Sequence, residues 1–160
     1  MNGIKWDKTL EIGVPSIDAD HQNIIAWIND IQEMGNHDFP HKTLVYVLDC
    51  LIDYVAAHFR HEEQVMQACA YGGLEAHKLA HEKFEEKINQ IHSQLMNNSQ
   101  SVVSEEVIGF LVQWLADHIV NVDALMIPYV RGNKAALLDD KPMAAKSALF
   151  ALRNGQGPPA

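Results

Sequence analysis

Residues 44–66 of the chain read LVYVLDCLIDYVAAHFRHEEQVM, and this stretch decides the fold class. Apolar residues recur in it every three or four positions, which is the pattern of one face of an amphipathic helix. His58 and Glu62 fall inside that apolar stripe, four residues apart, so both side chains leave the same face of the helix. The stretch therefore predicts a long helix that carries two polar side chains into a protein core.

Three further stripes of the same kind surround this stretch. The four expected helices cover about residues 16–35, 40–72, 74–97 and 104–127. Ser16 and Ser104 are the expected N-caps, Pro40 suits a first turn, and Pro128 lies just beyond the expected end of the last helix. No segment alternates with a period of two, so no sheet is expected.

Four such helices joined by short loops favour an all-α fold, an up-down-up-down antiparallel four-helix bundle. Residues 1–15 show no helical period and are expected to form an extended N-terminal arm. We expect one domain over residues 1–130 and a C-terminal extension over 131–160. In that extension a short helix is predicted for Ala144–Arg153, and the last residues, from Gly155, are predicted to be disordered.

The composition excludes several classes of partner. The formal net charge of −9 disfavours nucleic acid and anionic membrane. No run approaches the roughly 18 to 20 apolar residues of a membrane span, and the polar first residues do not resemble a signal peptide. We therefore expect a cytoplasmic protein. Cys50 and Cys69, both expected on the second helix and roughly 28 Å apart, should not form a disulfide.

The nine histidines point to the chemistry, because each of the four stripes contains at least one. A single histidine on an apolar helix face is usually a hydrogen-bonded core residue. Four helices that each bury one are different, since unpartnered buried polar groups cost several kcal/mol each. His77 and His81 are also four residues apart and share a face. Imidazole together with carboxylate suits Fe, Mn or Zn, so the sequence predicts a metal site in the bundle.

At these positions the sequence resembles the hemerythrin family, over about residues 4–130. The matching elements are Trp6 with Ile17–His21, His58–Glu63 with Met66, His77 to His81 with Phe84, and Trp114 through His118 to Asp123. The resemblance implies two Fe ions per chain, joined by an oxo or hydroxo bridge. It implies that His77, His81 and His118 bind one iron, that His21 and His58 bind the other, and that Glu62 and Asp123 bridge the two.

The resemblance also implies a function, which is reversible dioxygen binding by an oxygen carrier, store or delivery protein that is not an enzyme. The iron with two histidines would have an open position, behind an apolar wall that excludes water. The residues expected in this oxygen pocket are Ile24, Phe59, Trp114, Leu115 and Ile119. An oxygen or redox sensor module is the alternative. A di-iron oxidase or peroxidase is less favoured, because such sites use more carboxylates and Glu-x-x-His motifs. The sequence identifies no protein partner.

Helix geometry separates ligands from neighbouring residues. His61 lies about 60° round the helix from His58 and outside the apolar stripe, whereas Glu62 lies about 40° away and inside it. His92 is roughly 16 Å along its helix from His81, too far for the same centre. The other polar residues expected to be solvated are His37, His41 and Glu63.

Asp123 is where helix geometry and the resemblance conflict. It follows His118 by five residues, which on a regular α-helix is about 140° away. We therefore predict a distorted or π-like turn between the two residues, maintained by the metal, because a π-type turn brings residues five apart into line. The alternative is that the helix ends early and Asp123 reaches the site from irregular backbone before Pro128.

Overall fold

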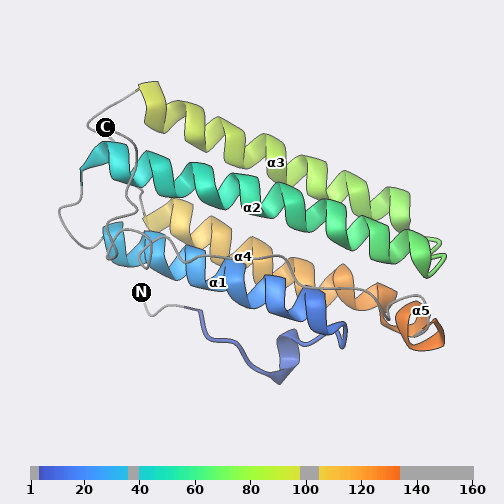
Figure 1. Cartoon of the computed structure of the whole chain (residues 1–160). Coiled ribbons are helices and arrows are strands. Elements are labelled where there is room, and N and C mark those ends of the chain that lie inside the picture. Colours follow the sequence, from blue (N-terminus) through green and yellow to red (C-terminus); the bar gives the residue numbers. More distant parts are fainter. Residues whose placement is uncertain (1–3, 36–39, 98–104, 134–160) are drawn as a thin grey trace.

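The computed structural model describes residues 4–35, 40–97 and 105–133, and the regular structure in these ranges is entirely helical (Figure 1). The four long helices are α1 (Pro15–Gly35), α2 (His41–Ala68), α3 (Leu74–Asn97) and α4 (Glu105–Asn121). Three short elements accompany them, namely the 3₁₀ turns η1 (Lys8–Leu10) and η2 (Asp123–Met126) and helix α5 (Ile127–Gly132). The predicted all-α four-helix bundle is confirmed.

Neighbouring helices run antiparallel, with α1 packed against α2 and α4, and α2 packed against α3 (Figure 1). This order places the beginnings of α1 and α3 beside the ends of α2 and α4. Residues that lie far apart in the sequence therefore meet at one end of the bundle. The predicted metal ligands lie in these four segments.

The other half of the bundle is packed with aliphatic side chains. Ile31, Leu48, Ile88 and Leu111, one from each long helix, are at most 2% exposed. Burying one side chain of this size stabilises a fold by about 1.5–3 kcal/mol. This apolar half stabilises the packing of the four helices, so the other half of the bundle can accommodate buried polar side chains.

The N-terminal arm is fixed on α1 by side-chain hydrogen bonds. The Asp18 carboxylate accepts hydrogen bonds from the backbone N–H of Ile12 (2.9 Å) and Gly13 (3.1 Å), where Gly13 has a φ of +84°. The described part of the arm, residues 4–14, is extended as expected, apart from the short turn η1. Ser16 is not the N-cap, because α1 begins at Pro15; proline suits the first turn, where its missing N–H leaves no bond unmade.

Helix α2 ends four residues before the predicted Gly72. Its last residue is Ala68, and Ala70 then adopts a left-handed conformation with a φ of 53°. Cys69 therefore lies just beyond the helix rather than on it. Both cysteines are free, as expected.

Helix α4 ends at Asn121, and the chain continues through η2 into α5. Pro128 was predicted to lie just beyond the end of the fourth helix; α4 ends seven residues before it, and Pro128 sits in the first turn of α5, a position that proline tolerates. Helix α5 also crosses the predicted domain boundary at residue 130. The predicted helix Ala144–Arg153 and the predicted disorder from Gly155 lie outside the described residues.

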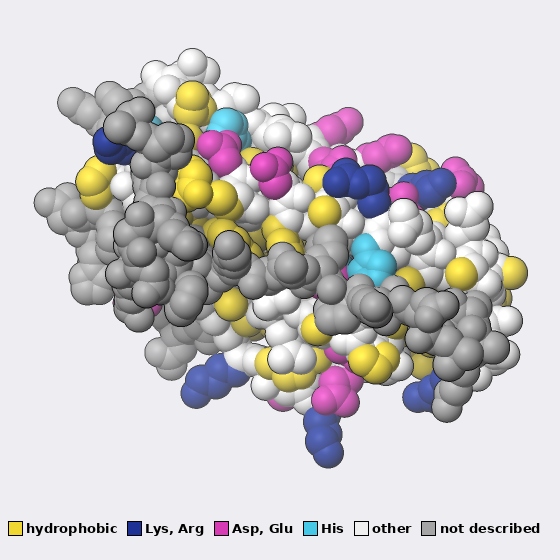
Figure 2. Space-filling model, viewed as in Figure 1, with side chains coloured by type: hydrophobic (Ala, Val, Ile, Leu, Met, Phe, Trp, Pro, Cys, Tyr) yellow, Lys and Arg dark blue, Asp and Glu magenta, His cyan; other side chains and the backbone are white. Residues whose placement is uncertain are grey.

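The segment Glu106–Gly132 is long and apolar enough to cross a membrane on length and composition alone, with a mean hydropathy of 1.3 over an 18-residue window. In the bundle this segment is α4, η2 and α5, and it places Ile108, Leu111, Leu115 and Ile119 in the core. On the face shown in Figure 2, Asp and Glu side chains gather over α2 and α3, with Lys and Arg side chains among them. We interpret the segment as a core helix of the bundle.

Candidate metal centre

Seven buried polar side chains meet at the end of the bundle where α1 and α3 begin. None of them is more than 4% exposed. They come from all four long helices and from η2, and they are the seven residues predicted from the sequence as metal ligands: His21, His58, Glu62, His77, His81, His118 and Asp123. Subsets of them bring donor atoms within 4.8 Å of one another, as one group of five and one group of three that share Glu62.

Glu62 uses its two oxygens on opposite sides of the cluster. Its Oε1 faces the Nε2 atoms of His21 (3.3 Å) and His58 (3.5 Å). Its Oε2 faces the Nε2 atoms of His81 (3.2 Å) and His77 (3.7 Å). One carboxylate therefore connects two separate groups of imidazoles.

Asp123 repeats this division on the other side of the cluster. Its Oδ1 faces the Nε2 atoms of His118 (3.0 Å) and His77 (3.3 Å), and its Oδ2 faces Nε2 of His21 (3.4 Å). The two carboxylates thus divide the five imidazoles into a set of three and a set of two. Such an arrangement suits two metal ions that share both carboxylates.

The spacing of the imidazole nitrogens fits a metal ion. Nε2 of His81 lies 3.0 Å from Nε2 of His77 and 3.2 Å from Nε2 of His118. Two ligands at right angles, each about 2.1 Å from one ion, are about 3.0 Å apart. In addition, both oxygens of Glu62, both oxygens of Asp123 and Nε2 of His21 are buried with no hydrogen-bond partner. Buried polar atoms of this kind are costly unless a cation takes up their lone pairs.

Electrostatics also favours positive charge in the cluster. Burial alone would raise the pKa of Glu62, but the surrounding histidines hold it well below its ordinary value. Burial alone would lower the pKa of His21, but its contacts with Asp123 and Glu62 raise it to about 10. The two carboxylates therefore stay ionised and attract a cation.

Aromatic rings support two of the imidazoles. Phe59 stacks on His81 with ring centroids 3.7 Å apart, and Trp114 stacks on His118 at 4.4 Å. These contacts restrict the rotation of rings whose nitrogens face the carboxylates.

A small apolar cavity adjoins the cluster. The rings of His21, His58 and His118 form its polar wall, and the predicted pocket residues Ile24, Phe59, Trp114 and Leu115 line it. Its volume of about 10 Å³ is close to what one water-sized molecule requires. Ile119 was predicted to belong to this wall, but it is buried in the core and does not line the cavity.

Comparison with known proteins agrees with this geometry. The family model described as Hemerythrin HHE cation binding domain matches residues 13–130. The chain belongs to the hemerythrin family. It is 30% identical over 141 residues to a bacteriohemerythrin of Pseudomonas aeruginosa, covering 88% of this chain and 90% of that protein.

Two other hemerythrins are also similar. A myohemerythrin of Theromyzon tessulatum is 29% identical over 119 residues, which is 74% of this chain and 87% of that protein. A crystal structure of wild-type hemerythrin superposes with a TM-score of 0.73 at 27% identity, covering 79% of this chain and 97% of that one. The fold and the family are therefore shown by sequence and structure alike.

Asp123 reaches the cluster through a distorted turn after the end of α4. The π-like form of the predicted turn is not found, because the N–H of Val122 makes an ordinary α-helical bond to the carbonyl of His118 (2.8 Å), but the backbone departs from regular helix at Val122, whose φ is −114°. Helix α4 then stops, and Asp123 opens the 3₁₀ turn η2. The alternative was correct in that the helix ends early, but Asp123 lies in a 3₁₀ turn rather than in irregular backbone.

Two carboxylates next to the cluster were not identified from the sequence. Glu63 was predicted to be solvated, but its side chain is only 25% exposed and its Oε1 accepts a hydrogen bond from Nδ1 of His81 (3.0 Å). Asp20 is fully buried and lies against His58 and His61. Each residue is adjacent in sequence to a predicted ligand, and this adjacency is the sequence feature that could have identified it.

The remaining histidines lie outside the cluster. His61 directs its Nδ1 at Asp20 (2.8 Å), and His92 pairs with Asp49 (2.6 Å). His41 was predicted to be solvated, but its Nε2 lies 2.9 Å from the carbonyl oxygen of Leu95, because the start of α2 faces the end of α3. His37 lies outside the described residues.

Proposed function

We propose that this hemerythrin binds dioxygen reversibly at a non-haem di-iron centre and serves as an oxygen carrier, store or delivery protein. The observation that carries the proposal is the pair of carboxylates, Glu62 and Asp123, each with one oxygen toward the three-histidine set and one toward the two-histidine set. In this assignment His77, His81 and His118 hold one iron and His21 and His58 hold the other. Glu62 and Asp123, with an oxo or hydroxo group, bridge them.

The cavity supports the position of the oxygen site. It touches His21 and His58, which belong to the iron with fewer ligands, and also His118. When bound, two irons can supply two reversible one-electron changes to dioxygen. The protein contributes a wall of Ile24, Phe59, Trp114 and Leu115, which leaves little space for water and offers it few polar contacts.

The donor set favours binding over oxidative catalysis. Five imidazoles and two carboxylates surround the proposed centre, whereas bundle enzymes that activate oxygen use carboxylate-rich sites. We therefore propose that the protein is not an enzyme. Its cytoplasmic location stays a prediction from the sequence.

Leu115 and Ile119 form a matched pair that tests the oxygen pocket. Both are buried on α4, but only Leu115 lines the cavity. Leu115→Ala should speed autoxidation of the oxygenated protein by about tenfold or more, because it opens space for water beside the centre. Ile119→Ala should change autoxidation much less. The decay of the visible absorption band of the oxygenated protein gives both autoxidation rates. Equal rates in the two variants would count against the assigned pocket.

His58 and His61 test the ligand assignment on α2. His58→Ala should lose iron, since Nε2 of His58 faces Glu62 inside the cluster, whereas His61→Ala should keep two irons per chain. Elemental analysis of protein loaded under identical conditions gives the answer. If the two variants lose the same amount of iron, the assignment of His58 is wrong.

A further inference from the structure

Asp20 is a buried carboxylate that belongs to neither iron in the proposed assignment. It lies on α1 directly before His21, and it is 0% exposed. Its carboxylate contacts Tyr54, His58 and His61, which all lie on α2. Burying a charged group costs free energy because the charge loses its hydration, so a buried carboxylate is expected to have specific partners.

The nearest ligand to Asp20 is His58. Oδ2 of Asp20 lies 3.6 Å from Nδ1 of His58, which is longer than a formed hydrogen bond. That Nδ1 atom is buried and has no hydrogen-bond partner, while Nε2 of the same ring faces Glu62 at 3.5 Å. A ring that offers the Nε2 lone pair to a metal must carry its proton on Nδ1, and a small movement would let that N–H donate to Asp20.

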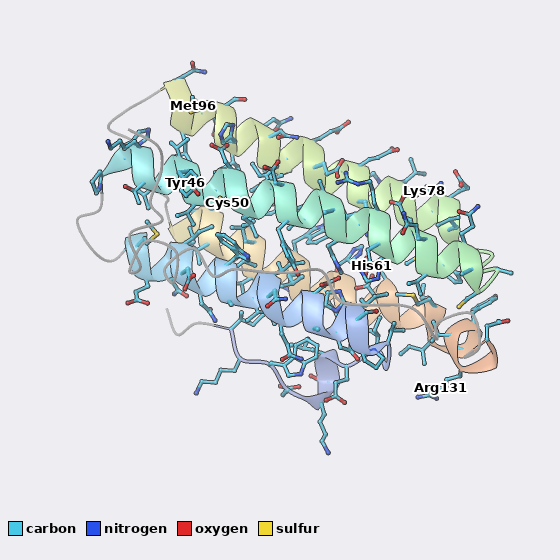
Figure 3. All side chains as sticks on the ribbon, in the orientation of Figure 1. Tyr46, Cys50, His61, Lys78, Met96 and Arg131 are labelled. Atoms are coloured by element: carbon cyan, nitrogen blue, oxygen red, sulfur yellow. The ribbon has the colours of Figure 1, made fainter. Side chains whose placement is uncertain are left out.

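Other side chains hold Asp20 in this position. The Tyr54 hydroxyl donates to Oδ1 (2.9 Å), and Nδ1 of His61 lies 2.8 Å from Oδ2. Asn23 in turn donates to the Tyr54 hydroxyl (3.1 Å). Both oxygens of Asp20 thus lie within hydrogen-bond distance of a side-chain oxygen or ring nitrogen, which fixes the carboxyl group beside α2. Figure 3 shows His61 between α2 and α1.

We propose that Asp20 is a positioning residue that fixes the orientation and proton position of His58 and thereby favours the ferric form of the two-histidine iron. Tyr54 and His61 hold Asp20 in place for this role. A carboxylate behind an imidazole makes the ring a stronger donor, which stabilises the higher oxidation state. The inference rests on the proposed di-iron centre and adds to it a residue that tunes the iron beside the cavity.

The three-histidine set has a corresponding carboxylate, but in a different environment. Glu63 is hydrogen-bonded to Nδ1 of His81 and is 25% exposed, whereas Asp20 is fully buried. Charge effects are weaker where water screens them. The two-histidine iron should therefore depend more strongly on Asp20 than the other iron depends on Glu63.

The test compares Asp20→Asn with Asp117→Asn in the full-length, iron-loaded protein. Both changes remove one negative charge directly before a predicted histidine ligand, but Asp117 is exposed and bonded to Asn121. Asp20→Asn should weaken binding of one iron by about 10- to 100-fold, measured by chelator competition. It should also raise one midpoint potential in spectroelectrochemistry, by about 59 mV if the preference for ferric iron falls tenfold. Asp117→Asn should change neither.

Tyr54→Phe is the second variant, and it keeps the carboxylate. Without the phenol donor, Asp20 is held less firmly beside His58, so the same potential should rise, as in Asp20→Asn but by less. If Asp20→Asn does not fold, an unchanged potential in Tyr54→Phe overturns the inference. If Asp20→Asn folds, keeps two irons and matches Asp117→Asn in potential, the inference is wrong and the centre stands. A wild-type protein that takes up no iron overturns both.

Discussion

Replacing Glu62 by alanine is expected to abolish iron binding, reducing the metal content from two irons per chain to none. The reason is that Glu62 faces imidazoles in both halves of the cluster, so its loss removes a ligand from each iron at once. It also removes one of the two carboxylates assigned as ligands of the proposed centre. Elemental analysis after anaerobic loading and desalting measures the effect.

Glu82 provides the control for this experiment. It lies on α3 directly after His81 but is exposed to solvent, so Glu82→Ala removes the same charge without touching the cluster. We expect this variant to hold two irons. Full iron content in Glu62→Ala would show that Glu62 is not a shared ligand.

Removing the metal should destabilise the bundle strongly. Without ions, five imidazoles and two carboxylates remain buried at one end of the core, and several of their atoms have no partner. A ligand present at about 1,000 times its dissociation constant stabilises the folded state by about 4 kcal/mol. For a chain of this size, that corresponds to a change in melting temperature of about 8–16 °C.

Thermal unfolding followed by circular dichroism tests this prediction on loaded and chelator-treated protein. Chelator should have no effect on Glu62→Ala, which serves as the metal-free control. Equal melting temperatures for loaded and stripped wild-type protein would mean that the cluster is stable without metal.

The periodic pattern of the sequence was sufficient to place the four long helices and to select Glu62 over its neighbour His61. Both inferences depend only on 3.6 residues per turn within a continuing helix. The pattern could not place Asp123, because its position depends on where α4 stops. That end is set by the change to a 3₁₀ turn after Val122, and angular arithmetic along a regular helix does not predict it.

The carboxylates around the cluster were missed for a related reason. Glu63 lies off the apolar stripe of α2 and therefore resembles a surface residue, but α3 partly covers it and brings His81 to it. Asp20 precedes a ligand on α1 and is covered by α2. The sequence periodicity of a single helix shows which of its faces is apolar. Whether residues at the edges of that face are buried depends on how closely the neighbouring helices approach. The same limit explains Ile119, which is core but does not line the cavity.

Visible spectroscopy of iron-loaded, anaerobically reduced protein tests the central proposal most directly. The spectrum is recorded before exposure to air, after exposure, and again after purging with inert gas. Reversible oxygen binding predicts a charge-transfer band that appears with oxygen, disappears on purging and returns in a second cycle with little loss. A protein that holds two irons but shows no band with oxygen, or shows one that purging does not remove, would contradict reversible oxygen binding.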